Sequence, residues 1–308
     1  MPTLVHTQTV DSMNDKQNNN KKIVILNFDD GYKSHFLNAK PILDKYGFKA
    51  SFYIVCNFVG KSAVEMNSED ILDFEGKGKE QMSWQDIIEL QRQGHDIGSH
   101  SMNHYRLNEI SEEQMQFEIG QSKQCLLNHG INSTVFAYPF SEGWDDEVIV
   151  SIVSKYYFLA RAGNVPLMFL RCSENGNNFD LEGEQSDCRT YDDGGDLTFV
   201  NRYSIRTWSH DAVKIDNSYD DSEMLEKFME VVNSQTTYNI NGKINAIPIV
   251  KYHKIDNSGE DYSTSPDLFS DEMRYLYDSG FTILTMRDLG YDENSNYLYI
   301  KSAELKRN

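Results

Sequence analysis

The feature that most constrains the fold of this chain is the alternation of short apolar runs with stretches of helical spacing. The first pair is the β-branched run 23–28 and the amphipathic stretch 36–47. Further strands are expected at 50–55, 96–100, 134–140, 158–163, 246–253 and 281–286, and further helices at 83–94, 111–130, 145–157, 221–235 and 265–280. Continuous apolar strands that alternate with helices predict a parallel sheet covered by helices, either open or closed into a barrel.

Three parts of the chain depart from this rhythm. Residues 1–20 end in the polar, Asn-rich "DSMNDKQNNN", which predicts a disordered tail. Residues 173–196 hold eight acids, one arginine and four glycines, which indicates a long surface insertion. The pattern resumes at 202–208. We therefore expect one domain over 21–290 that contains this insertion, followed by a C-terminal extension over 291–308.

The overall composition excludes several partners. The net charge is −19, and nucleic acids and anionic membranes both require a basic surface. No apolar run approaches the ~18 residues of a membrane span. Residues 1–20 lack the basic start and apolar stretch of a signal peptide. We therefore expect no nucleic-acid partner and no transmembrane segment, and the sequence gives no sign of an oligomeric state.

The four cysteines form no closely spaced pair, which argues against a cysteine-based zinc site. Cys56 follows an apolar run and Cys125 lies in a helical pattern, so we expect both to be small buried apolar residues. Cys172 and Cys188 bracket a polar loop, and an oxidising compartment would allow a disulfide between them.

Two adjacent acids, Asp29 and Asp30, follow the first predicted strand and precede Gly31. Neighbouring residues of a strand point to opposite faces, so these carboxylates share a site only if the strand has ended. Gly31 allows such an ending because glycine adopts positive φ without steric cost. Ligand sites in parallel α/β proteins gather at the carboxyl ends of strands.

Two histidines follow another predicted strand, 96–100. His100 and His104 are four residues apart, so one helical turn would place both imidazoles on one face. Together with Asp30 they form the ligand set of a catalytic zinc or a similar ion. The same ligand types also serve non-haem iron oxygenases. Those enzymes need no second acid, whereas here Asp29 would be available to accept a proton from water.

Two further strand ends contribute candidate residues. Pro139 has no N–H and a fixed φ, so the next residue, Phe140, is a candidate to donate its backbone N–H to an oxyanion. His253 ends the apolar strand 246–253 and is a candidate general acid.

In this order, "NFDDGY", "GHDIGSHSMNH", "FAYPF" and "VKYH" resemble the motifs of the polysaccharide deacetylases, the NodB-homology group known as carbohydrate esterase family 4. The resemblance covers about 22–163 and returns at 246–290. It implies an α/β fold, a distorted (β/α) barrel with about seven parallel strands. It also implies a metal-dependent hydrolase that removes N-acetyl groups from an N-acetylated sugar polymer resembling chitin, peptidoglycan or poly-N-acetylglucosamine.

The resemblance assigns a role to each candidate residue. Asp29 would be the base and His253 the acid that protonates the leaving amine. Asp30, His100 and His104 would hold one divalent metal, usually zinc and sometimes cobalt or nickel. Phe140 would supply the backbone N–H.

The chain departs from the family pattern in two places. The third motif lacks the arginine that orients the base in many members, so Arg202 or Arg206 is the expected replacement. The fourth motif, which would orient His253, is absent.

Two alternative functions stay open. They are a related amidohydrolase acting on a non-polymeric amide and an inactive carbohydrate-binding relative. The substrate class implies an extracellular or cell-envelope location.

Overall fold

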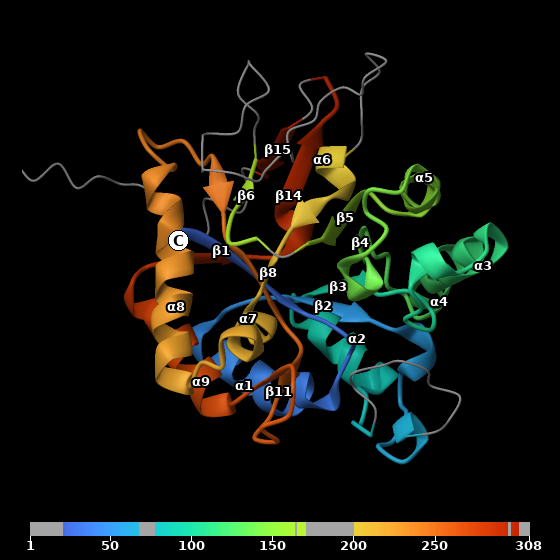
Figure 1. Ribbon diagram of the computed structural model, residues 1–308, viewed down its shortest axis with the longest axis horizontal. Coiled ribbons are helices and arrows are strands. Elements are labelled where there is room, and N and C mark those ends of the chain that lie inside the picture. Colours follow the sequence, from blue (N-terminus) through green and yellow to red (C-terminus); the bar gives the residue numbers. More distant parts are fainter. Residues whose placement is uncertain (1–20, 68–77, 164, 171–199, 295–296, 302–308) are drawn as a thin grey trace, which may run out of the picture.

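A computed structural model describes residues 21–67, 78–163, 165–170, 200–294 and 297–301, with a parallel sheet at its centre (Figure 1). The strands of this sheet are β1 (Ile23–Phe28), β2 (Ser51–Ile54), β3 (Asp96–Ser99), β4 (Val135–Ala137), β5 (Leu159–Ala162), β7 (Ile205–Arg206), β8 (Trp208–Ser209), β10 (Ile249–Tyr252) and β13 (Thr282–Leu284). All its pairs are parallel. The predicted α/β class is confirmed.

The sheet closes on itself through the segment 205–209. Its strands follow the order β7-β5-β4-β3-β2-β1-β10-β8, and β13 joins β1 beside this path. The two terminal strands of the path, β7 and β8, are separated in the chain by Thr207 alone. Segment 205–209 therefore pairs with β5 on one side and β10 on the other. Counted as one strand, it gives a barrel of seven strands, as the sequence predicted, with β13 as an addition.

Helices surround the sheet on the outside (Figure 1). They are α1 (Lys40–Tyr46), α2 (Trp84–Arg92), α3 (Glu112–Gln116), α4 (Ser122–Asn128), α5 (Glu147–Tyr156), α6 (Val200–Tyr203), α7 (His210–Asn217), α8 (Asp221–Ser234) and α9 (Pro266–Asp278). The π-helical segments η1 (His35–Ala39) and η5 (Phe117–Gln121) continue into α1 and join α3 to α4. Short 3₁₀ turns are η2 (Cys56–Phe58), η3 (Glu65–Asn67), η4 (Leu107–Glu109), η6 (Pro139–Ser141), η7 (Gln235–Thr237) and η8 (Met286–Asp288). Helix α7 was not expected from the sequence.

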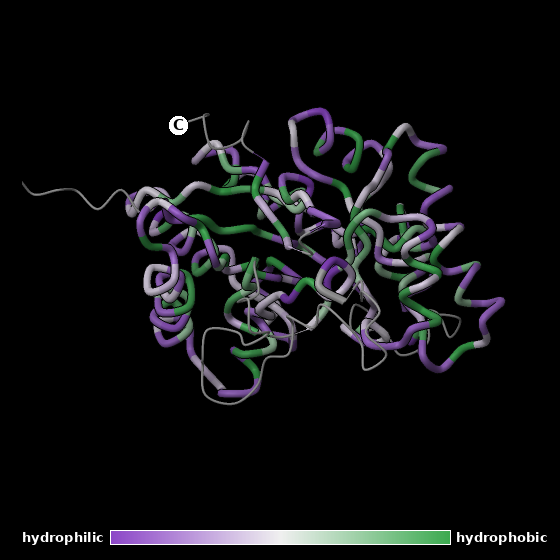
Figure 2. Tube along the Cα trace, turned by 90° about the horizontal axis from the view of Figure 1, so that it is seen from above, coloured by the Kyte–Doolittle hydropathy of each residue, from purple (hydrophilic) through white to green (hydrophobic). Residues whose placement is uncertain are grey.

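Helix ends follow the expected local chemistry. Ser83 caps α2 and forms a reciprocal capping box with Asp86, because its hydroxyl accepts from Asp86 N and the Asp86 carboxylate accepts from Ser83 N. Gly47 ends α1 in the left-handed conformation, with φ of 71°. Figure 2 shows hydrophilic and hydrophobic segments alternating along the helices, as expected where one face of each helix packs on the sheet.

The strands bury different residues on their two faces. The outward face packs under the helices, with Val24, Leu26, Phe28, Phe52 and Val250 in the same cluster as residues of α2, α8 and α9. The inward face forms a second cluster that includes Ile23, Ile25, Leu159, Ile205 and Ile249. Since side chains alternate along a strand, the next inward positions toward the carboxyl ends are Asn27, Arg161 and Lys251. The barrel interior is therefore apolar at one end and polar at the other.

Three small two-stranded sheets accompany the barrel. They pair β6 (Met168–Phe169) with β9 (Ala246–Ile247), β11 (Lys254–Ile255) with β12 (Ser263–Thr264), and β14 (Leu289–Asp292) with β15 (Tyr297–Ile300). Leu289, Tyr291 and Leu298 of the last hairpin belong to the inward cluster. The expected domain boundary at residue 290 thus falls inside β14, and residues up to 300 pack against the barrel. The predicted tail 1–20 and insertion 173–196 lie outside the described residues.

Cys56 is buried in the core and Cys125 packs against it, as expected, but nothing in the sequence indicated that the two are bonded to each other. They form a disulfide with a Cα–Cα distance of 6.5 Å, which links the segment after β2 to α4. The pattern of each cysteine resembled that of a core residue, and only the packing of α4 beside β2 and β3 brings the two together. Cys172 and Cys188 lie outside the described residues. In the described part of the chain, no helix is both long and apolar enough to cross a membrane.

Candidate active site

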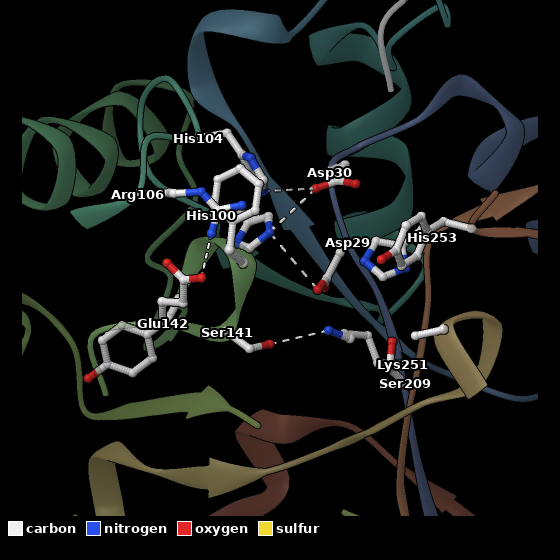
Figure 3. Close-up of a pocket in the computed structure, with 14 residues that line it drawn as sticks. Asp29, Asp30, His100, His104, Arg106, Ser141, Glu142, Ser209, Lys251 and His253 are labelled. Carbon is white, nitrogen blue, oxygen red and sulfur yellow. Dashed lines mark hydrogen bonds and ion pairs between the residues drawn. The ribbon is translucent and has the colours of Figure 1, made fainter. Parts of the chain in front are cut away.

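A pocket of about 290 Å³ opens at the carboxyl ends of the barrel strands. Its lining combines residues from five segments that are distant in the sequence, shown in Figure 3. The lining residues are Asp29, Asp30, His100, His104, Arg106, Tyr138, Phe140, Ser141, Glu142, Ser209, Ala212, Lys251, His253 and Tyr262. Six of the candidate residues from the sequence therefore meet in one pocket: Asp29, Asp30, His100, His104, Phe140 and His253.

The turn after β1 brings Asp29 and Asp30 to the same side. Strand β1 ends at Phe28, and Asp29 N still donates to Tyr252 O of β10 at 3.0 Å. Asp30 and Gly31 then both adopt positive φ, 72° and 78°. The bend therefore begins one residue earlier than the glycine suggested. Positive φ is costly for an aspartate, and such strain concentrates at functional sites.

His100 and His104 converge through a loop, so the expected helical turn between them is wrong. Ser101 and His104 have positive φ, 67° and 61°, which no helix allows. The buried Glu118 carboxylate on η5 accepts from the backbone N–H groups of Met102 and Asn103 at 3.0 and 2.8 Å. Glu118 thus fixes the loop from outside the pocket.

The three predicted metal ligands point at one another (Figure 3). Asp30 Oδ1 lies 3.4 Å from Nε2 of His100 and 3.4 Å from Nε2 of His104. One ligand atom from each of the three residues fits within 4.8 Å of the others. Bonds of ~2.0–2.1 Å to a tetrahedral ion would separate its ligands by ~3.4 Å. The spacing therefore fits a tetrahedral divalent ion.

The hydrogen bonding of His100 also fits a metal. Its Nδ1 lies 2.8 Å from Ala137 O, which only accepts, so Nδ1 carries the proton. In the neutral ring, Nε2 then presents a lone pair toward Asp30 Oδ1, which has no hydrogen-bond partner in the structure. Two acceptors that face each other in a buried site are stabilised by a cation between them.

Burial and neighbouring charges set the protonation states of this group. Burial alone would raise the pKa of the Asp30 carboxyl, but the neighbouring His100 and the charges of His104 and His253 lower it far below its usual range. Burial, followed by the charge of His100, lowers the pKa of His104 to about 3. The carboxylate and the neutral imidazole are the protonation states that bind metals.

The arginine that contacts Asp29 is Arg161 of β5, which sequence reasoning missed. Its guanidinium forms a buried ion pair with Asp29 Oδ1 and lies over the Tyr53 ring, 4.0 Å from the ring centroid. Gly98 allows the Tyr53 ring to lie here, because a Cβ at that position would come within 2.3 Å of it.

The expectation that Arg202 or Arg206 orients Asp29 is not met by the geometry. Arg202 donates to Phe158 O at 2.5 Å and pairs with Glu293, whereas the Arg206 guanidinium lies 3.7 Å from the centre of the Trp144 ring. One feature of the sequence could have pointed to Arg161: it is a charged residue within an otherwise apolar strand.

Asp211 holds His253 in place. Its Oδ2 accepts from His253 N at 2.7 Å, and its Oδ1 lies 2.9 Å from His253 Nδ1. Burial would raise the pKa of Asp211, but the charge and hydrogen bonds of His253 lower it to about 2. Nδ1–H therefore points at Asp211, and Nε2 is left to face the pocket. Asp211 lies two residues after the end of β8, so the signal in the sequence was an acidic residue close to a strand end.

The loop after β4 forms another wall of the pocket. Phe140 and Ser141 both have positive φ, 56° and 59°, directly after Pro139. The Arg106 guanidinium stacks on the Phe140 ring at 3.8 Å and pairs with Glu142. The loop is thus held at the pocket by contacts with the loop that carries His104.

Comparison with known proteins finds a family match for the N-terminal half of the barrel. Residues 16–157 match the family model described as polysaccharide deacetylase. This segment, a little under half of the chain, is similar to the polysaccharide deacetylase family. The match includes the first three of the four motifs and confirms the resemblance to this family.

One curated relative and two solved structures illustrate the similarity of this chain to other proteins. YxkH of Bacillus subtilis (strain 168), whose name places it provisionally among the polysaccharide deacetylases, is 28% identical over 120 residues. That alignment spans 39% of this chain and 37% of YxkH, so well under half of the relative's length is matched.

The solved structures are far more distant in sequence. The T48 deacetylase, solved with substrate, is 14% identical and has a TM-score of 0.48, with 87% of this chain and 89% of that chain covered. The peptidoglycan deacetylase PdaC from Bacillus subtilis is 15% identical with the same TM-score and coverage. Identities this low say nothing about substrate.

Proposed function

We propose that this protein is a metal-dependent hydrolase that removes N-acetyl groups from an N-acetylated sugar polymer and releases acetate and a free amine. The observation that carries the proposal is the convergence of Asp30, His100 and His104 between two buried pairs, Asp29–Arg161 and His253–Asp211. The match of residues 16–157 to the polysaccharide deacetylase family model supports the reaction class.

Asp30, His100 and His104 would hold the metal, with zinc as the first choice and cobalt or nickel as alternatives. A divalent ion bound there supplies a Lewis acid that polarises the amide carbonyl and lowers the pKa of water from 15.7 toward ~7. Glu118 and Ala137 O keep the two histidines oriented from outside this group.

Asp29 is placed to act as the base. Its Oδ2 lies 4.0 Å from His100 Nε2, so it borders the metal ligands without joining their cluster. Arg161 occupies its other oxygen and keeps the carboxylate charged and fixed. Asp29 then accepts the proton of the water that attacks the amide carbon.

Phe140 and His253 complete the proposed reaction. The backbone N–H of Phe140 donates to the oxyanion that develops on the carbonyl oxygen. His253, held by Asp211 through Nδ1, donates a proton from Nε2 to the amine nitrogen as the C–N bond breaks. Asp29, Phe140 and His253 thus each have one step in the proposed reaction.

An extracellular or cell-envelope location fits the disulfide between Cys56 and Cys125. Disulfides form and persist in oxidising environments, where sugar polymers of cell walls are also found. The disulfide therefore supports the location that the substrate class suggests.

The test is acetate release from N-acetylglucosamine oligomers, with and without a chelator, followed by addition of zinc, cobalt or nickel. We expect release that chelation abolishes and metal restores. Asp29→Asn should retain metal and lose turnover by about 10²–10⁴-fold, whereas His100→Ala should lose metal. Sugar binding without acetate release would instead identify an inactive relative, and a requirement for iron and oxygen would identify an oxygenase.

A further inference from the structure

We propose that His35 is a positioning residue for the general acid, and that its ring N–H fixes the backbone from which the His253 side chain enters the pocket. The inference rests on the proposed function, because it takes His253 as the group that protonates the leaving amine. It deepens that function by adding a residue outside the pocket lining on which this one chemical step depends.

The His35 ring donates a hydrogen bond to the backbone carbonyl of His253. Its Nε2 lies 2.5 Å from His253 O, which only accepts, so Nε2 carries the proton. In the neutral ring Nδ1 then has no proton, and it has no hydrogen-bond partner among the described residues. Burial lowers the pKa of His35 to about 4, which keeps the ring neutral. The contact with His253 O is therefore the hydrogen bond of this ring.

The surroundings of His35 would suit an apolar ring equally well. The imidazole is fully buried, and its neighbours include the rings of Phe28 and Phe52, with centroids 5.3 and 5.9 Å away. Both phenylalanines belong to the apolar cluster under the helices. Burying a polar ring costs free energy unless its polar atoms are bonded, and here Nδ1 is not. A phenylalanine would fill this place without that cost, so the N–H is what distinguishes the histidine.

The carbonyl of His253 lies just beyond the last bond between β1 and β10. Asp29 N donates to Tyr252 O, whereas the next carbonyl, His253 O, accepts from His35. The N–H of His253 donates to Asp211 Oδ2 at 2.7 Å. Because each peptide group is planar, these contacts fix the peptide groups on both sides of the His253 Cα, and with them the direction of its side chain. Asp211 orients the ring, and His35 holds the backbone that carries it.

Two neighbours of His35 hold the residues that follow His253. Ser34 Oγ accepts from Ile255 N at 3.2 Å, and Asn38 Nδ2 donates to Ile255 O at 2.7 Å. These contacts join the start of η1 to β11, directly after the acid. His35 is the first residue of η1, and π-helical turns are frequent at functional sites. The start of η1 therefore anchors the backbone on which the position of the acid depends.

The experiment compares two acetyl substrates that differ in their need for an acid. The amine of an N-acetylglucosamine oligomer must be protonated as it leaves, whereas the nitrophenolate of para-nitrophenyl acetate leaves as a stable anion. His35→Phe keeps a ring of similar size and removes the N–H. We expect it to lower kcat for the oligomer about 10–100-fold, the effect of displacing a reacting group slightly, and to leave kcat for the ester close to the wild-type value. His35→Gln, which retains a donor, should restore most of the amide turnover.

His95→Phe is the matched control. His95 is also fully buried and lies against Phe52, with ring centroids 5.3 Å apart, but its Nδ1 accepts from Ala50 N and it does not line the pocket. It should lower stability and leave the amide-to-ester ratio as it is. If His35→Phe does not fold, Asn38→Ala tests the same segment at a half-buried position and should lower amide turnover alone. Equal loss on both substrates, or loss on neither, overturns the inference.

His253→Ala separates this inference from the proposed function. Loss of amide turnover in His253→Ala without such a loss in His35→Phe keeps the function and overturns the inference. Full amide turnover in His253→Ala refutes the proposed acid and the inference with it. If the wild type turns over neither substrate, the proposed function fails, and the nitrogen NMR spectrum of the His253 ring tests the contact by itself. A changed balance of the two ring tautomers in His35→Phe then supports the inference, and an unchanged spectrum overturns it.

Discussion

The Asp211 carboxylate contacts His253 twice, through the backbone N–H at 2.7 Å and through Nδ1 at 2.9 Å. Asp211 is the second residue of α7, which follows β8 directly, and His253 follows β10, so the pairing of these two strands sets the contact. A single carboxylate thereby fixes the position of the residue, the orientation of its ring and the location of the ring proton.

Replacing Asp211 by Asn should lower kcat by about 10²–10⁴-fold, because the amide no longer fixes the tautomer that presents Nε2 to the pocket. Bound metal, measured by elemental analysis, should stay at the wild-type level. Loss of metal in Asp211→Asn would show that Asp211 supports the ligand cluster instead.

Replacing Arg161 by Met should reduce kcat/KM at least 100-fold, because Asp29 would lose the cation that keeps it charged and oriented. A further loss of about 3–5 kcal/mol of stability is expected, since a buried carboxylate would be left without its partner. Steady-state kinetics and urea unfolding measure the two effects. Arg206→Met is the control, and it should change kcat/KM far less because its guanidinium stacks on Trp144.

Replacing Glu118 by Gln should weaken metal binding about 10–100-fold, the usual effect of removing a group that orients metal ligands. Glu118 Oε2 accepts from the N–H groups of Met102 and Asn103, and Oε1 accepts from Asn103 Nδ2 at 2.5 Å. In Gln one of these oxygens becomes an NH₂ group that faces a donor. Competition with a chromophoric chelator measures the affinity. Glu113→Gln, an exposed change on the preceding helix α3, should leave the affinity as it is.

Reducing the disulfide between Cys56 and Cys125 should lower the free energy of unfolding by about 4 kcal/mol, the chain-entropy estimate for a loop of 69 residues. Peptide mapping without reductant should recover the two cysteines in one linked peptide, and the Cys56→Ser, Cys125→Ser double variant should show a lower Tm. Linked peptides that instead join Cys56 or Cys125 to another cysteine would contradict the structure.

His95 should make stability depend on pH. Burial lowers its pKa from 6.5 to about 4, and its Nδ1 accepts from Ala50 N at 3.2 Å, which requires the neutral ring. The unfolded chain therefore binds this proton first as pH falls. The contribution of His95 to the free energy of unfolding is fully present above pH 6.5 and declines between pH 6.5 and about 4. Below that range it is lost, and the total loss is about 3 kcal/mol. Urea unfolding should show a flatter slope in His95→Gln, whereas the exposed His129→Gln should keep the wild-type slope.

The sequence predicted those parts of the site whose residues are close together in the chain. The apolar run 23–28 followed by two acids indicated a strand end, and the spacing of His100 and His104 indicated two ligands from one segment. The rhythm of strands and helices predicted the α/β class. These signals are local, because strand periodicity and turn chemistry depend on neighbouring residues.

Tertiary structure alone decided which residues support those groups. Arg161, Asp211 and Glu118 lie 132, 42 and about 15 positions from the groups they contact, so no spacing in the sequence reveals them. Barrel closure through 205–209 brings β5 and β10 to either side of one segment. The same closure turns Lys251 inward, toward Ser141. Contacts of this kind depend on strand order and register, and pairing between distant strands is set by the packing of the whole barrel.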